Sequence, residues 1–370
     1  TGCIPLRNIT AHCVTGITVR IERRLIMIRF NNDYNHGAHP AILKAIADTN
    51  DTSYGGYGED EWCDKASFII RNIIDRPDAE VRFFPGATQA NFIVIDAALS
   101  PVQSVIAADT GHINCHEAAS IENTGHKILA LPNTDGRITA AQIEACAAAY
   151  YEADEPEYLT EPKMVYISFP TESGTLYSKQ ELTDIYAVCK AHDMPLFIDG
   201  ARLGYGLQSP ACDVTLPELA NLCDVFYIGG TKCGALFGEA VVILKESLKK
   251  DFRYIIKQRG GMFAKGRLLG IQFDTLFTDG LYEAICGEAV KKAMTLREAF
   301  LAKGISMYGS SMTNQQFPIL TDAQKEALAK NFAFEYWGEA KEGKSIVRFC
   351  TSWATNDAQI KALTDAIAAL

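Results

Sequence analysis

A lysine stands alone in an otherwise apolar stretch, "DVFYIGGTKCGALFGEAVVIL" (224–244). Lys232 lies among glycines, between residues 225–228 and 240–244, two apolar runs that are each typical of a buried strand. Lysine is rarely buried without a function. Because desolvation lowers the pKa of an amine, this lysine could be the nucleophile that forms a Schiff base. The alternative is a lysine that extends from a tight turn into solvent.

An acid stands at the end of another apolar run, in "PLFIDGARLG" (195–204). Asp199 leaves a predicted buried strand, and a carboxylate in that position needs a partner. A protonated pyridine nitrogen would serve, because the carboxylate keeps the ring charged and makes it an electron sink. An internal ion pair between Asp199 and Arg202 is the alternative interpretation.

The stretch "RFFPGATQANF" (82–92) combines a strand, a glycine turn and the start of a helix. Gly86 would let the backbone approach a ligand, and Thr88 is the predicted N-cap of the helix. Main-chain amides at such a helix start bind phosphate. The sequence contains neither the dinucleotide pattern GxGxxG nor the P-loop lysine motif. Together with Asp199 and Lys232, this turn predicts pyridoxal 5′-phosphate as the cofactor and no metal.

The elements that position these residues alternate between strand and helix from residue 80 onward. This pattern predicts an α/β fold with a mostly parallel sheet, covered by helices on both faces. Ligands bind at the carboxyl ends of such strands, where Asp199 and Lys232 stand. We expect a large cofactor-binding domain over residues 27–250 and a smaller C-terminal α/β domain over 251–370. The strands expected in the smaller domain are 305–309, 316–320 and 345–350.

Composition narrows the possible partners. The chain of 370 residues has a formal net charge of −10, which argues against nucleic acid or an anionic membrane as a partner. Its 11 cysteines include no CxxC pair, as expected for reduced thiols in a cytoplasmic enzyme.

Residues 1–26 contain four arginines and one acid. That composition is typical of an organelle-targeting segment, and an extension without a role in the fold is equally compatible with it.

Longer motifs connect the sequence to a family. They are "YGED", "PGATQAN", "HINCHE", "PTESGTLYSKQEL", "DGARL", "GGTKCGALFGEAVV" and "VRFCTSW". With these motifs the chain, from about Phe30 to its end, resembles the threonine aldolase and β-eliminating lyase family of pyridoxal-phosphate enzymes. It is most similar to the low-specificity L-threonine and phenylserine aldolase branch. The resemblance implies an aspartate-aminotransferase-like (fold type I) architecture, with a large domain built on a seven-stranded sheet.

The resemblance implies roles for the residues around the cofactor. Lys232 matches the Schiff-base lysine, Asp199 the acid on the pyridine nitrogen, and Arg202 the arginine near the cofactor oxygen and the substrate carboxylate. His112 matches the histidine that stacks on the ring; without the family it would be interpreted as a hydrogen-bonded histidine at a strand end. The phosphate loop corresponds to Gly86, Ala87 and Thr88.

Three further positions concern the substrate. Arg348 matches a second carboxylate-binding arginine, although a buried acid elsewhere could be its partner instead. Asn32 stands where the family has a serine and can still donate a hydrogen bond to a carboxylate. Glu172 stands where better-known relatives have a histidine near the substrate hydroxyl.

The family also forms homodimers or homotetramers whose active sites are shared between chains. Lys265 is the nearest equivalent of an arginine that reaches the phosphate of the neighbouring chain, and Arg267 is the alternative. Tyr57 lies in "SYGGYGEDEW" (53–62), a glycine- and aromatic-rich segment typical of an interface. We expect Tyr57 to reach the substrate in the neighbouring site. The alternative is a mobile surface loop.

The implied activity is retro-aldol cleavage of L-threonine, L-allo-threonine or related β-hydroxy-α-amino acids to glycine and an aldehyde. Either His112 with a bound water or Glu172 would take the hydroxyl proton. The alternative activity is β-elimination, in which Lys232 removes the α-proton. A non-catalytic relative that only binds cofactor or amino acid is a third interpretation, disfavoured by the presence of both Lys232 and Asp199.

Overall fold

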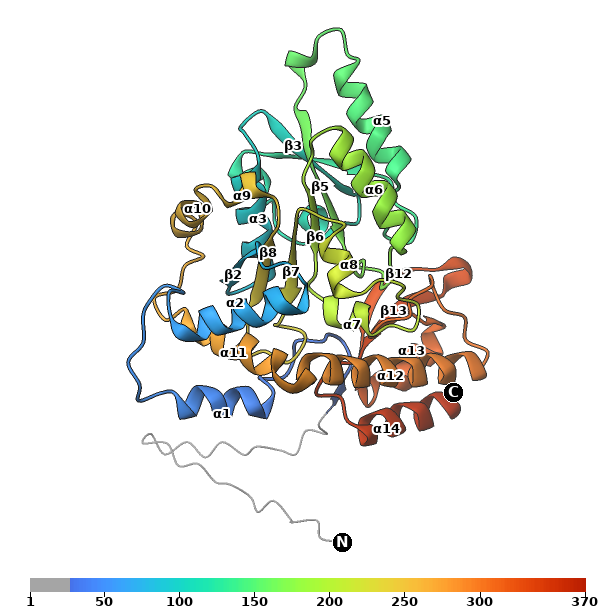
Figure 1. The fold of residues 1–370 in the computed structure, drawn as a ribbon. Helices are drawn as coiled ribbons and strands as arrows, with labels where there is room; N and C mark the ends of the chain where they lie inside the picture. The colour runs from blue at the N-terminus through green and yellow to red at the C-terminus, as the bar shows by residue number, and fades with distance from the viewer. Residues whose placement is uncertain (1–26) are drawn as a thin grey trace, which may run out of the picture.

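A seven-stranded mixed sheet forms the centre of the computed structural model, which describes residues 27–370 (Figure 1). The arginine-rich segment 1–26 lies outside the described residues. The strand order is β2-β8-β7-β6-β5-β3-β4, and β8 is antiparallel to both of its neighbours. The strands are β2 (Glu80–Phe84), β3 (Gln103–Ala108), β4 (Lys127–Leu131), β5 (Glu161–Ser168), β6 (Leu196–Asp199), β7 (Val225–Gly229) and β8 (Glu239–Ile243).

Apolar side chains cover both faces of this sheet. In β7, Phe226 and Ile228 enter one hydrophobic core, and Val225 and Tyr227 enter a second core on the opposite face. A strand that is buried on both faces has a continuous apolar sequence. The apolar runs that were predicted as strands are confirmed. The helices of this part are α1 (Pro40–Asp48), α2 (Glu61–Ile73), α3 (Ala87–Ala98), α4 (His112–Cys115), α5 (Ala140–Tyr151), α6 (Lys179–Ala191), α7 (Leu203–Leu207), α8 (Leu216–Ala220), α9 (Glu246–Lys249), α10 (Phe252–Gln258) and α11 (Arg267–Phe277).

The C-terminal elements, orange and red in Figure 1, build a third core around Phe30, Phe300 and Phe349. The short strand β1 (Ile28–Arg29) pairs in parallel with β11 (Phe332–Ala333), so the first described residues lie among the last elements. The other elements are α12 (Leu281–Ala302), β9 (Gln315–Gln316), β10 (Ile319–Leu320), α13 (Asp322–Ala329), β12 (Glu335–Glu339), β13 (Ser345–Cys350) and α14 (Asp357–Ala368).

Two local predictions are wrong. The expected strand at 305–309 makes only an isolated bridge, from Met307 to Pro318. The amides of Tyr308 and Ile319 donate across it to the oxygens of Phe317 and Ser306, and the pairing does not extend beyond these two bonds. The N-cap of α3 is Gly86 and not Thr88, since the helix already begins at Ala87. Within the described residues, no side chain caps α3, so the amides of its first turn remain available to a ligand. Between residues 27 and 370, no helix is long and apolar enough to cross a bilayer.

Candidate active site

A cavity lies where the central parallel strands end. Ser168 is the last residue of β5, Asp199 is the last residue of β6, and Lys232 follows β7 by three residues. This is the edge of an α/β sheet where ligands bind. Ten residues line the cavity: Ala87, His112, Ser168, Pro170, Glu172, Asp199, Ala201, Arg202, Tyr227 and Lys232. Six of them were predicted from the sequence as site residues.

Asp199 is a buried anion in the wall of the cavity. Its Oδ1 accepts a hydrogen bond from the amide of Ala201 at 3.0 Å, and its Oδ2 accepts from Tyr166 and from Asn91, the latter at 3.2 Å. Burial raises the pKa of Asp199, but the charge of His112 and the bond from Tyr166 outweigh it, so the pKa is lowered. Asp199 therefore stays ionised, as a carboxylate opposite a pyridinium nitrogen must. The ion pair with Arg202, considered as an alternative, does not form.

Lys232 lies in a turn that only small residues allow. A side chain at Gly229 would collide with the carbonyl oxygen of Ala201, which lies 2.4 Å from the position of a Cβ, and Gly234 has a φ of +103°. Desolvation lowers the pKa of Lys232, and the positive charge of Arg202 lowers it further. A lowered pKa supplies the neutral amine that a nucleophile requires.

The Arg202 guanidinium is paired with Asp33, which the sequence analysis did not identify. Arg202 Nε lies 2.7 Å from Asp33 Oδ2 and Nη2 lies 3.1 Å from Oδ1, and Asn314 donates to Oδ2 at 2.9 Å. Burial opposes ionisation of Asp33, but Arg202 and Lys232 lower its pKa to about 2. The neighbouring Asn32 accepts a bond from the Tyr34 amide and does not line the cavity. An acid beside Asn32 was visible in "NND", but its partner is 169 residues away.

His112 has a buried acidic partner, Glu117. Nδ1 of His112 lies 2.7 Å from Glu117 Oε1, and Asn91 and Ser120 also donate to Glu117, at 2.7 and 2.8 Å. Desolvation disfavours the charged imidazole, but the bond to Glu117 and the charge of Asp199 outweigh it, so the pKa of His112 is raised. Glu117 stood in the motif "HINCHE", yet no sequence signal distinguished it from a surface acid.

Glu172 is held at the cavity by two donors. Its Oε1 accepts from the backbone amide of His112 at 2.9 Å and from the Ser168 hydroxyl at 2.7 Å. Burial raises the pKa of Glu172, and the nearby charge of Asp199 acts in the same direction. A carboxylate with a raised pKa is a stronger base than one in water.

Glu239, the first residue of β8, is another buried acid and contacts the turn that carries Lys232. It accepts from the Thr231 hydroxyl at 2.7 Å and from the Gly230 amide at 3.1 Å. Burial raises its pKa to about 8, opposed in part by Thr231 and by the charge of Lys232. These bonds fix both sides of the turn that presents Lys232.

Arg348 lies one side chain beyond the cavity. Its Nη1 donates to Gln315 Oε1 at 3.0 Å, and the amide of Gln315 donates in turn to the backbone oxygen of Glu172 at 3.4 Å. Its Nη2 pairs with Glu335 of β12, and the guanidinium stacks 4.9 Å from the ring of Trp337. Arg348 thus has the acidic partner considered as an alternative, although that acid is half-exposed and not buried.

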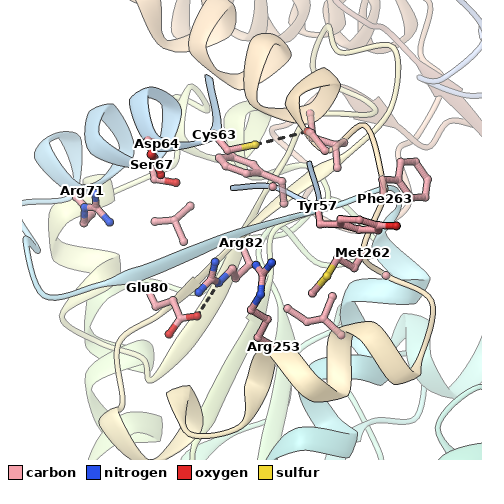
Figure 2. Close-up of a pocket in the computed structure, with 17 residues that line it drawn as sticks. Tyr57, Cys63, Asp64, Ser67, Arg71, Glu80, Arg82, Arg253, Met262 and Phe263 are labelled. Atoms are coloured by element: carbon pink, nitrogen blue, oxygen red, sulfur yellow. Dashed lines mark hydrogen bonds and ion pairs between the residues drawn. The ribbon is translucent and has the colours of Figure 1, made fainter. Parts of the chain in front are cut away.

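Tyr57 lines a different pocket, shown in Figure 2, together with Arg82, Arg253 and Met262. Lys257 Nζ lies 4.3 Å from the Tyr57 ring centroid. Within its own chain, Tyr57 is therefore not part of the Lys232 cavity. Lys265 is exposed and also lies outside that cavity, and Arg267 stacks 5.4 Å from the ring of Tyr54.

These residues fit pyridoxal 5′-phosphate. The uncapped first turn of α3 offers amides for a phosphate, Asp199 offers a buried anion for a ring nitrogen, and Lys232 offers an amine for an aldehyde. In the part of the chain that the structure describes, no cluster of three or more His, Cys, Asp or Glu side chains is arranged to hold a metal ion.

Comparison with known proteins identifies the family. The beta-eliminating lyase family matches residues 39–348. The low specificity L-threonine aldolase of Pseudomonas aeruginosa is 29% identical over 339 residues, which cover 90% of this chain and 95% of that protein. The solved threonine aldolase of Leishmania major is 44% identical, with a TM-score of 0.89 over 92% of this chain and 99% of that one.

The fold extends to more distant proteins. A Thermus thermophilus aspartate aminotransferase is 14% identical, with a TM-score of 0.68 over 93% of this chain and 91% of that one. This likeness confirms the aspartate-aminotransferase-like fold that the sequence predicted. On the length of the family match and the likeness to the Leishmania structure, the chain belongs to the beta-eliminating lyase family.

Proposed function

We propose that this protein is an aldehyde lyase that uses pyridoxal 5′-phosphate to cleave L-threonine, L-allo-threonine or related β-hydroxy-α-amino acids to glycine and an aldehyde. The observation that carries the proposal is one cavity lined by a nucleophilic lysine, a buried anion and a basic carboxylate: Lys232, Asp199 and Glu172. The two relatives described as threonine aldolases, from Pseudomonas and Leishmania, support the same reaction.

Four parts of the chain would hold the cofactor. Lys232 would bind its aldehyde carbon, Asp199 its ring nitrogen and the amides after Gly86 its phosphate, while His112 would contact the ring. When bound, the cofactor supplies an electron sink for the pair of electrons released at the α-carbon of the substrate. Glu117 would fix His112 by accepting its Nδ1–H, and this bond favours the charged imidazole beside Asp199.

Two arginines would bind the substrate carboxylate. Arg202 lines the cavity, and Asp33 fixes its guanidinium by two hydrogen bonds. The N–H groups of Arg202 that are not bonded to Asp33 are therefore held in a fixed orientation. Arg348 is connected to the cavity through Gln315 and Glu172. Planar guanidinium groups bind carboxylates with paired hydrogen bonds, which would orient the α-carbon of the substrate.

Between the two candidate bases, the pKa directions favour Glu172. A raised pKa favours the protonated form of His112, and its Nδ1 is already hydrogen-bonded to Glu117. Glu172 has a raised pKa as a carboxyl group, which matches it better to a hydroxyl proton. We therefore assign the hydroxyl proton to Glu172.

Assembly and location complete the proposal. We infer a cytoplasmic homodimer or homotetramer in which Tyr57 and Lys265 reach the neighbouring active site, since neither lies in its own cavity. The nine cysteines that the structure describes are free thiols, which suits a reducing compartment. We also propose a large domain that begins at residue 27 and a small C-terminal domain, which together enclose the substrate. Because α10 and α11 pack into the cores on the central sheet, the large domain extends beyond the boundary predicted at residue 250.

The test is product analysis with a panel of β-hydroxy amino acids and cofactor-loaded protein. Threonine should give glycine and acetaldehyde, and phenylserine should give glycine and benzaldehyde. Lys232→Ala is the matched control and should release neither. Ammonia and a keto acid in place of glycine and aldehyde would show β-elimination and overturn the assignment.

A further inference from the structure

The two arginines assigned to the substrate carboxylate differ in the exposure of their acidic partners. Arg202 and Asp33 are both enclosed, with side-chain exposures of 11% and 0%. Arg348 is also enclosed, at 9%, but Glu335 is 46% exposed. Water can therefore solvate the Glu335 carboxylate when it leaves its arginine, while Asp33 would have to remain as an unsolvated anion. Of the two acids, only Glu335 can leave its arginine at modest cost.

Glu335 can move without disturbing the backbone. It faces Arg348 directly across the antiparallel pair β12–β13, and β12 is an edge strand of its sheet. The register of β12 shifts between Tyr336 and Gly338, immediately after Glu335. Rotation of a half-exposed side chain at this edge breaks no strand pairing.

The guanidinium of Arg348 does not depend on Glu335 for its orientation. Its Nη1 is fixed by Gln315 at 3.0 Å, its Nη2 also points toward the backbone oxygen of Asn31 at 3.4 Å, and its plane is supported by Trp337. Removal of the Glu335 carboxylate would leave these three contacts in place. Glu335 therefore has two remaining roles: it neutralises the charge of Arg348, and it accepts a hydrogen bond from Nη2 of that arginine.

We propose that Glu335 is an exchangeable counter-ion of Arg348, which the α-carboxylate of the substrate replaces on binding. The inference rests on the proposed function only in taking Arg348 as a carboxylate-binding residue. Glu335 then acts as a specificity determinant. A ligand with a free carboxylate can exchange with it, whereas an amino-acid amide cannot offer Arg348 an anion of equal strength.

The test measures glycine binding to the cofactor-loaded protein by titration calorimetry. Glu335→Gln removes the competing charge, so the glycine Kd should fall roughly three- to tenfold, the range of a partly exposed ion pair. The affinity for glycinamide should stay unchanged. Glu339→Gln removes the same charge from the same strand, where Glu339 pairs with Tyr336, and should leave both affinities unchanged.

A double-mutant cycle ties the effect to the arginine. In Arg348→Ala, glycine should bind more weakly, and addition of Glu335→Gln should no longer improve its affinity. An unchanged or higher glycine Kd in Glu335→Gln overturns the proposal, because it would mean that Glu335 supports Arg348 instead of competing for it. Glu335→Ala gives the same expectation if the glutamine variant folds poorly. Glycine binding is independent of aldehyde release, so failure of the aldolase assay leaves this test readable.

Discussion

Replacement of Asp33 by asparagine should destabilise the protein by about 3 kcal/mol. The pKa of Asp33 falls from 3.8 to about 2, which corresponds to roughly 2–3 kcal/mol at about 1.4 kcal/mol per pKa unit. Removal of one partner from a buried ion pair costs more, about 3–5 kcal/mol, because the guanidinium stays buried without its anion. The amide oxygen of asparagine still accepts one bond from Arg202, which places the expected loss near the lower end.

The matched control is Asp78→Asn, in a surface pair of the same geometry. Arg76 Nε and Nη2 lie 2.9 and 2.8 Å from the two carboxylate oxygens of Asp78, and the hydrogen bond from Arg76 lowers its pKa to about 2 as well. The Asp78 side chain is 55% exposed, however, so solvent screens the pair. We expect a loss below about 1 kcal/mol, because exposed ion pairs contribute little to the free energy of unfolding.

The assay is urea unfolding of the cofactor-free protein, followed by circular dichroism, for wild type and both variants. The pKa of Asp33 is lowered on folding, so its contribution is complete above about pH 4 and is lost as the pH falls toward 2. The difference between wild type and Asp33→Asn should shrink over that window. A loss in Asp33→Asn no larger than in Asp78→Asn would refute the argument that burial decides the strength of these pairs.

Three other predictions concern the chemistry. Borohydride should attach the cofactor covalently to the peptide that contains Lys232, as mass spectrometry can show; label on another lysine would contradict the assignment. Glu172→Gln should lower aldehyde release by roughly 10²–10⁴-fold with cofactor affinity intact, and an unaffected rate would exclude Glu172 as the base. The pKa of Glu172 is raised above 4.5, its usual value for a glutamate. As the pH is lowered, the wild-type enzyme should therefore lose activity at a pH higher than 4.5. Inactive Lys232→Ala and Lys265→Ala chains, mixed and reassociated, should regain part of the activity; no recovery despite proven subunit exchange would show that Lys265 does not act across an interface.

The apolar runs predicted the central sheet and two of the cavity residues, Asp199 and Lys232, for one physical reason, whereas His112, Arg202 and Glu172 were identified only through the family resemblance. A strand covered on both faces has a continuous apolar sequence, so a charged residue at its end stands out. Asp199 ends β6 and Lys232 follows β7 in this way, and the parallel sheet brings the two to one edge.

The acids that fix this site could not be predicted in the same way. Asp33 and Glu335 carry no local pattern, because each is defined by a partner in another element. Glu117 follows its partner His112 by only five residues, but nothing in the sequence distinguishes it from a surface acid. The bond of Asp33 to Arg202 spans 169 residues, and that of Glu335 depends on the register of β12 against β13. Only the folded chain shows that these acids face basic side chains.

The pairing of β1 with β11 has a consequence for biosynthesis. Ile28 pairs with Phe332, and the oxygen of Phe30 accepts the amide of Cys350 at 2.7 Å. At about 5–20 residues per second, a ribosome needs roughly 15–60 seconds to make the residues between these partners. The segment that carries Asp33 is thus synthesised early, but it can reach its folded position only after the C-terminal strands have been synthesised. A nascent chain arrested near residue 300 should contain β5, β6 and β7, but its Arg202 would still lack the strand that holds Asp33 in place.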